Sequence, residues 1–173
     1  REAVAAALTA FESDHSSDVP LRLRAFWTRH VTGTLNGEQM MSALSDPDKH
    51  IRGWAIQIAV ANEGTMPRFV EMAQNDDSLV VRRYLASKLQ TLNPEHRWDI
   101  VLGLIAHNRS QWDPNIPYLT WYGIAPLVES DPDKALTLVN QTSWLMLKDF
   151  ITRRAAVFPK GRTAITYSLS KAN

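Results

Sequence analysis

Apolar residues dominate one stretch near the middle of the chain, Ile51–Ala61. It reads IRGWAIQIAVA and contains only two strongly polar side chains. A helix that is apolar around most of its circumference must be buried on several sides. Asp46 and Pro47 stand just before it, and an aspartate followed by a proline is typical of a helix start. The pattern therefore predicts a buried helix that begins at Asp46-Pro47, runs to about Glu63 and stops at Gly64.

The same arrangement of polar and apolar positions recurs along the chain. An aspartate is followed six residues later by an arginine, and an aromatic residue stands two positions after that arginine. The aspartate and arginine pairs are Asp18 with Arg24, Asp46 with Arg52, and Asp76 with Arg82. The aromatic positions are Phe26, Trp54 and Tyr84, continued in weaker copies by Tyr118, Trp121 and Phe150. The arginines are 28 and 30 residues apart, and helical self-similarity at such a period is typical of an α-solenoid.

The six-residue spacing predicts a partner for each of these arginines. Six residues turn an α-helix by about 240°, so the aspartate and the arginine of one repeat are expected to face different ways. We therefore expect each arginine to pair with the aspartate at the helix start of an adjacent repeat, which gives a structural ladder of charge-assisted hydrogen bonds. The alternative is that the arginines bind an external anion at helix N-termini.

Helical periodicity, interrupted by Gly, Pro and Asp, divides the chain into helices and turns. The expected helices cover residues 1–12, 18–32, 37–45, 46–63, 65–75, 78–92, 94–107 and 117–126, one from 131, 143–157, and 162–170 as a further helix or a loose tail. Short helices alternate with longer ones. This alternation predicts an all-α fold, a right-handed α-solenoid of about five antiparallel helix pairs that forms a single domain over residues 1–173.

One segment, Asn108–Asp113, breaks the period. It extends the spacing of the aromatic positions to 37 residues, and an insertion in a solenoid is expected to project as a loop. Its tryptophan and arginine suit recognition of a partner, and two prolines follow them. We predict that Arg109, Trp112 and Tyr122 form or border the contact surface for a partner domain. The alternative is that Trp112 folds back over the fourth helix pair as part of the core.

The other tryptophans are distributed over the repeats. Trp27, Trp54 and Trp121 fall on the faces that are expected to be buried, and we predict that they belong to the core. Their helical spacing supports this assignment. The positions of Trp98 and Trp144 are not determined by the pattern.

Composition and charge narrow the class of protein. The chain is 45% apolar and 21% charged, which suits one globular domain with a sizeable core. Its net charge of +1 gives no general electrostatic case for binding nucleic acid or an anionic membrane, and no apolar stretch is long enough for membrane insertion.

Residues 148–173 carry six Lys or Arg and one acid. They are expected to be a terminal repeat separated from its neighbours, or alternatively a contact for an acidic partner or nucleic acid. The chain begins with Arg1, and we expect it to be excised from a longer protein.

Residues with catalytic or metal-binding chemistry are scattered. The absence of cysteine excludes disulfides, thiolate metal sites and covalent c-type haem attachment in this chain. The histidines form no HExxH motif and no i, i+4 pair; they are His15, His30, His50, His96 and His107. Acidic pairs stand at expected helix starts, where they complement the helix dipole; they are Asp46/Asp48, Asp76/Asp77 and Asp131/Asp133. We therefore expect no catalytic residue, no metal and no cofactor.

Two motifs carry a resemblance to known proteins. DPDKHIR at 46–52 and DDSLVVR at 76–82 resemble HEAT repeats, an α-solenoid family of paired antiparallel helices used chiefly as scaffolds. Residues 20–157 also include LRLRAFWTRHVTG, VRRYLASKLQTL, RWDIVLGLIAH and DPNIPYLTWYGIAPLV. Together they resemble the HEAT segment of bacterial, planctomycete-type membrane-bound dehydrogenases. The resemblance implies a β-propeller before the repeats and a haem-binding cytochrome c domain after them. Because Cys-x-x-Cys-His is absent here, it also implies that this segment carries neither cofactor nor active site.

These observations predict a non-catalytic HEAT-repeat scaffold, protein-interaction or spacer module of a larger haem-binding, dehydrogenase-like bacterial protein. Its partners are expected to be other domains of the same polypeptide or a separate protein, and not nucleic acid. Its location is expected to be extracytoplasmic, through the parent protein. The alternative is a HEAT-like DNA-binding enzyme of the alkylation-repair glycosylase type, which uses Trp, Asp and Arg on a concave basic face. The net charge of +1 weighs against this alternative.

Overall fold

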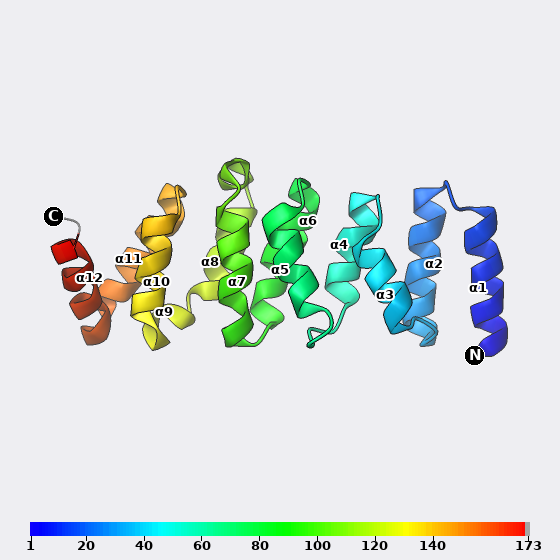
Figure 1. Cartoon of the computed structure of the whole chain (residues 1–173), viewed down its shortest axis with the longest axis horizontal. Coiled ribbons are helices and arrows are strands. Elements are labelled where there is room, and N and C mark those ends of the chain that lie inside the picture. Colours follow the sequence, from blue (N-terminus) through cyan, green and yellow to red (C-terminus); the bar gives the residue numbers. More distant parts are fainter. Residues whose placement is uncertain (172–173) are drawn as a thin grey trace. The chain divides into compact units, whose positions relative to one another are not determined.

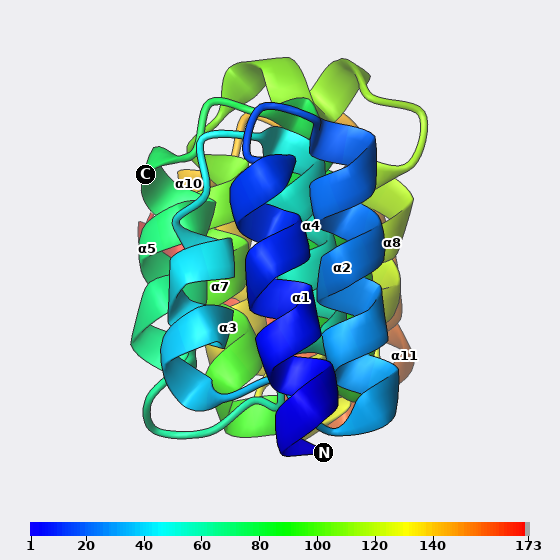
Figure 2. The ribbon, with the colours of Figure 1, turned by 90° about the vertical axis from the view of Figure 1, so that its right-hand side faces the viewer.

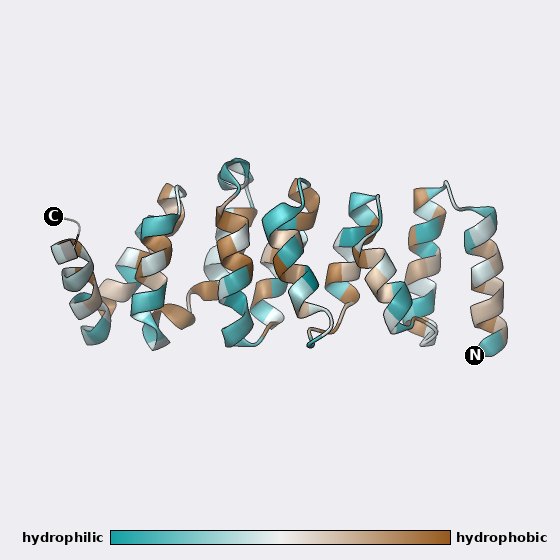
Figure 3. Ribbon diagram, viewed as in Figure 1, coloured by the Kyte–Doolittle hydropathy of each residue, from teal (hydrophilic) through white to brown (hydrophobic). Residues whose placement is uncertain are grey.

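The protein is all-α. A computed structural model describes residues 1–171, and this part consists of helices and short connections without a strand (Figure 1). The chain divides into two compact units, Arg1–Thr65 and Met66–Asn173. Within both units, individual helices carry apolar residues on one side and polar residues on another, as amphipathic helices do (Figure 3).

The first unit contains two helix pairs. Its elements are α1 (Glu2–Asp14), α2 (Val19–Thr32), α3 (Gly37–Leu44) and α4 (Lys49–Ile58). α1 packs against α2, α3 packs against α4, and α2 and α4 are in contact. Figure 2 looks along this unit from its N-terminal end and shows α1 beside α2, with α4 behind them.

The second unit contains the remaining helices. Its elements are α5 (Met66–Asn75), α6 (Leu79–Lys88), the 3-10 turn η1 (Leu89–Thr91), α7 (Pro94–Ile105), the 3-10 turn η2 (Asn108–Trp112), α8 (Ile116–Ile124), α9 (Leu127–Ser130), α10 (Pro132–Gln141), α11 (Leu145–Val157) and α12 (Pro159–Lys171). α5 packs on α7 and α10 packs on α12, whereas α6 packs on α8 and α8 packs on α11. The first helices α5 and α7 therefore pack on each other, and the second helices α6, α8 and α11 pack one after another.

Most helices lie where the sequence analysis predicted them, but α4 begins later and ends earlier than predicted. The N-cap of α4 is Asp48, whose carboxylate accepts from the backbone N–H groups of His50 and Ile51, rather than Asp46. α4 ends at Ile58 rather than near Glu63, because a polar turn competes with the helix. In that turn the Asn62 side chain accepts from two backbone N–H groups, and the Thr65 hydroxyl donates to the carbonyl of Val60.

The core uses different tryptophans from those predicted. Trp98 and Trp144 are buried, with 5% and 1% of their surface exposed. Trp27, Trp54 and Trp121 are only half-buried, so their assignment to the core was wrong. They lie on second helices whose apolar residues extend beyond the buried side, and periodicity alone does not distinguish the two sides of so apolar a helix.

A close contact between α5 and α7 in the second unit depends on a glycine. A Cβ atom at Gly103 in α7 would lie 2.8 Å from the Cβ atom and the carbonyl carbon of Ala73 in α5, and 2.9 Å from the backbone nitrogen of Gln74. Real Cβ atoms do not approach backbone atoms so closely. α5 and α7 must therefore separate if position 103 acquires a side chain.

We predict that Gly103→Ala lowers the free energy of unfolding by about 1–3 kcal/mol, because overpacking outweighs the better helix propensity of alanine. Gly37→Ala is the matched control, since Gly37 begins α3 and has no atom within 4 Å of the added Cβ position. Urea unfolding of the three proteins measures the difference. A Gly103→Ala protein as stable as the parent would contradict the close contact of α5 and α7.

Candidate functional site

The same type of hydrogen-bonded turn occurs in three connections between helices. One oxygen, Oδ1, of each aspartate accepts from the backbone N–H two residues later, at 2.8 Å for Asp46, 2.9 Å for Asp76 and 2.9 Å for Asp113. Such Asx turns fix the chain just before a helix begins. At Asp113 the same oxygen also accepts from the backbone N–H of Ile116, at 3.0 Å.

The other carboxylate oxygen, Oδ2, receives an arginine from the preceding helix pair. Arg22 binds Asp46 in the first unit, and Arg83 donates to Asp113 at 2.6 Å in the second. Contacts of the ladder type therefore exist, with Arg22 as the partner of Asp46 and Arg83 as the partner of Asp113. Arg24, which the spacing selected, is exposed, and its side chain has no hydrogen bond or ion pair within residues 1–171.

Two of the arginines that stand six residues after an aspartate bind the turn before their own helix. Nη1 of Arg52 donates to the carbonyl oxygens of Asp46 at 2.8 Å and Pro47 at 3.0 Å. Nη1 of Arg82 donates to the carbonyl of Asp76 at 2.6 Å. These bonds go to backbone carbonyls and not to the carboxylates, because each aspartate precedes the helix and the chain turns back between it and the arginine. A guanidinium here also complements the negative end of the preceding helix.

We predict that Arg22→Ala lowers the free energy of unfolding by about 1–2 kcal/mol, because it leaves the largely buried carboxylate of Asp46 without its charged partner. Arg24→Ala is the matched control on the same helix. Its free energy of unfolding is expected to stay within about 0.5 kcal/mol of the parent. Equal effects of the two substitutions in urea unfolding would remove the assignment of the ladder contact to Arg22.

The predicted loop after α7 is an ordered 3-10 turn, η2, held at both ends. Nε2 of His107 lies 3.1 Å from the carbonyl oxygen of Ala73, which only accepts, so Nε2 carries the proton. Nδ1 of His107 then accepts from Nη1 of Arg82, at 3.3 Å. Beyond the turn, Asp113 is fixed by Arg83, and the Ser143 hydroxyl lies 2.7 Å from Oδ1 of Asn108. These contacts tether η2 to three neighbouring segments.

This tethered turn exposes the tryptophan selected from the sequence. Trp112 is 82% exposed, Tyr122 on α8 is 55% exposed, and Arg109 is exposed as well. The alternative in which Trp112 folds into the core is wrong. Contact of Arg109, Trp112 and Tyr122 with a partner stays a prediction.

Aromatic side chains meet between second helices in both units. In the second unit the ring of Phe150 lies 5.4 Å from Trp121 and 6.3 Å from Tyr118, between ring centroids. In the first unit Trp27 and Trp54 lie 4.9 Å apart, with their planes at 75°. The first member of the aromatic series is therefore Trp27, whereas the predicted Phe26 is buried in the core.

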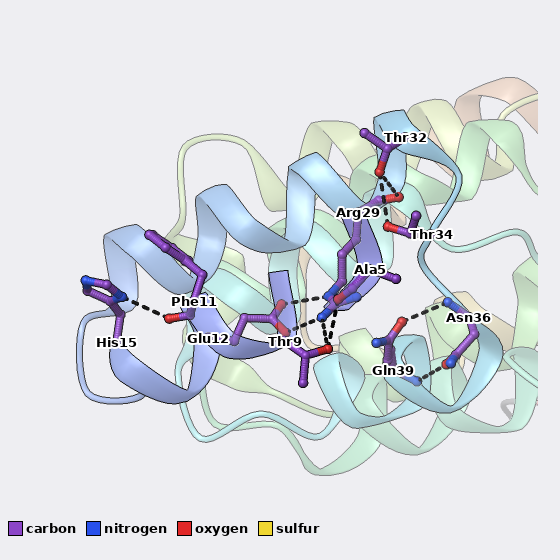
Figure 4. Close-up of polar contacts among 10 residues, drawn as sticks. All are labelled: Ala5, Thr9, Phe11, Glu12, His15, Arg29, Thr32, Thr34, Asn36 and Gln39. Carbon is purple, nitrogen blue, oxygen red and sulfur yellow. Dashed lines mark hydrogen bonds and ion pairs between the residues drawn. The ribbon is translucent and has the colours of Figure 1, made fainter. Parts of the chain in front are cut away.

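The first unit also holds a polar cavity that the sequence did not reveal. It has a volume of about 500 Å³ and lies beside two ion pairs, Arg22 with Asp46 and Arg29 with Glu12. Arg29 is 2% exposed; its Nε and Nη2 donate to the two oxygens of Glu12 at 2.9 and 2.7 Å, and Nη2 also donates to Thr9 at 2.9 Å (Figure 4). Because each arginine already faces a carboxylate, the cavity offers no uncompensated cation to an anionic ligand. The pair of Arg29 and Glu12 could not be found in the sequence, because the two residues are 17 positions apart and no repeated motif has that spacing.

Within residues 1–171, no group of three His, Cys, Asp or Glu side chains is arranged to hold a metal ion. Nor does any helix there combine the length and apolar character needed to cross a bilayer. Comparison with known proteins gives no matching family, no similar curated protein and no similar solved structure.

The pKa of the Asp113 carboxyl depends on its burial and on the donors around it. Burial raises the pKa of this carboxyl, but the hydrogen bond from Arg83, the N–H groups of Asn115 and Ile116 and the charge of Arg83 together hold the pKa below its ordinary value of 3.8. The folded state therefore favours the ionised form. Its stabilising contribution is present above the ordinary pKa and is lost as the pH falls through the lower pKa of the folded protein.

We predict that Asp113→Asn lowers the free energy of unfolding by about 1–2 kcal/mol at neutral pH, because Asn keeps an Oδ1 acceptor but loses the charge opposite Arg83. The difference from the parent is expected to shrink between about pH 5 and about pH 2, as the parent carboxyl takes up its proton. Urea unfolding across this range measures it. A difference that is constant with pH would show that the charge of Asp113 does not contribute.

Proposed function

We propose that this chain is a non-catalytic protein-interaction module, built as a right-handed HEAT-like α-solenoid of about five helix pairs. The recurring unit supports this proposal: two helices, an Asx turn, and an arginine that binds the carboxylate or the carbonyl of that turn. The layers of α5 with α7 and of α6 with α8 fit the same architecture. Stacked repeats of this kind bury a core that no single pair encloses.

The observation that carries the interaction role is the position of Trp112. A tryptophan that is 82% exposed on a turn tethered at both ends loses little conformational entropy when a partner covers it. Exposed tryptophan and arginine side chains are the residue types most enriched among energetically dominant contacts. Arg109, Trp112 and Tyr122 are therefore our candidates for the centre and border of the contact surface.

The parent of this module is proposed to be a larger bacterial protein of the haem-binding, dehydrogenase-like type, and its location extracytoplasmic. This chain contains no cysteine, so a covalently attached c-type haem would be held by another part of that protein. The partner surface would then face another domain of the same polypeptide or a separate protein.

We predict that a photo-crosslinking amino acid at position 112 couples to one discrete protein in the native host, whereas the same amino acid at Thr137, exposed on α10, does not. The captured protein is then purified and its binding measured directly. Trp112→Ala should weaken that binding about 30-fold, the loss typical of a dominant contact residue, while the melting temperature stays unchanged. Unchanged binding of Trp112→Ala would contradict the proposed surface.

The glycosylase-like alternative makes a separate prediction. A DNA-binding face releases counterions, so its affinity falls steeply with salt. We expect no salt-dependent binding of a fluorescein-labelled duplex, because the net charge is +1 and Arg22, Arg29 and Arg83 are each paired with a carboxylate. Fluorescence anisotropy at two salt concentrations checks this, and tight binding at low salt that disappears at high salt would favour the alternative.

A further inference from the structure

The first unit contains an open groove on the side of α2 and α4. Six residues line it: Trp27, His30, Val31, Trp54, Gln57 and Ile58. Its volume is about 490 Å³. All six come from two helices in direct contact, so the walls are fixed by the packing of α2 on α4. We refer to it as the aromatic groove.

Two indole rings shape this groove. The centroids of Trp27 and Trp54 lie 4.9 Å apart at an interplanar angle of 75°, so the two rings meet edge to face and do not stack flat. Both side chains are half-buried and keep part of their surface accessible. Val31 stands at the rim with 80% of its surface exposed. Flat apolar faces set at an angle favour a ligand with small, rigid apolar groups.

The charge of the groove restricts its ligand further. Asp, Glu, Lys and Arg make up 21% of the chain, yet none of them lines the groove. His30 is the only titratable lining residue; it is exposed, and its ring has no hydrogen-bond partner in the described part of the chain. An uncharged ligand is complementary to such a surface, because a charged one would lose hydration without gaining an opposite charge.

We propose that the aromatic groove binds an uncharged, proline-rich segment of a partner protein in the polyproline II conformation. Proline rings are rigid and apolar and pack against indole faces. The carbonyl groups of this conformation have no internal hydrogen bonds, so they accept donors at the rim, such as a ring N–H of His30. Recognition of proline-rich segments by aromatic-lined grooves is an established physical mode.

The other common modes of peptide recognition fit the groove less well. Strand addition needs the edge of a sheet, and the described residues form no strand. Phosphopeptide recognition needs a cluster of arginines, which the lining lacks. An amphipathic helix presents apolar residues over two or more turns, whereas this groove is walled by six residues of two helices. An extended segment of a few residues matches its size.

The test uses the intact protein and a synthetic peptide of ten prolines, with a Gly-Ser peptide of equal length as the control ligand. Titration is followed by the indole N–H signals in ¹H–¹⁵N NMR spectra. We expect the signals of Trp27 and Trp54 to shift with the proline peptide alone, while those of buried Trp98 and Trp144 stay unchanged. Absence of any shift up to millimolar peptide, or shifts centred on Trp112, would overturn the proposal.

Two surface substitutions then separate binding from folding. Val31→Glu places a charge on the rim of the groove and should weaken binding of the proline peptide at least about tenfold. Val60→Glu is the matched control, because Val60 is 74% exposed and does not line the groove. Both proteins should melt like the parent, since neither valine is buried. Undiminished binding by Val31→Glu, equal losses in the two variants, or preference for an amphipathic helical peptide would each contradict the proposed ligand.

Discussion

The Asx turn between paired helices is the contact on which the arrangement of both units depends. One carboxylate oxygen of Asp46 or Asp113 fixes the backbone before the next helix, and the other receives an arginine from the preceding pair. A single side chain thus sets where a helix starts and where its neighbour lies. Arg52 binds a carbonyl group of the Asp46 turn, so this turn is held from both sides, and Arg82 binds the carbonyl group of Asp76 in the next turn. Because each contact is charge-assisted, a misplaced helix would leave a polar group without its partner.

Many helices could be predicted from the helical periodicity and from the Pro and Asp residues that mark helix ends. The Asp-Pro start of α10 and the start of α7 at Pro94 were placed correctly, as was the break of α8 near Pro126. These signals are local, because proline and aspartate act on the backbone within a few residues. The end of α4 was not predicted, because it depends on side-chain hydrogen bonds of Asn62 and Thr65 that compete with the helix.

The candidate surfaces were predictable only in part. Trp112 could be located because it interrupts the repeat, and an interruption is visible in the sequence. The choice of Arg83 over Arg82, and of Arg22 over Arg24, depends on where each side chain lies around its helix relative to the next turn. Arg82 and Arg83 differ by about 100° around their helix, and Arg22 and Arg24 by about 200°, so an error of one or two residues changes the partner. The pair of Arg29 with Glu12 had no sequence signal, because it joins two helices at a separation that no repeat imposes.

That ion pair has a consequence for the N-terminal helix. α1 contains no buried residue, and its Glu12 and Thr9 accept hydrogen bonds from Arg29 of α2. We expect a helix with so little apolar burial to unfold locally and to exchange its amide hydrogens before the rest of the protein. Its attachment weakens with ionic strength more than that of helices held by apolar packing. Release of α1 would remove Glu12 from the lining of the polar cavity and uncover Arg29, so we expect the N-terminal end of the first unit to open more readily as the salt concentration rises.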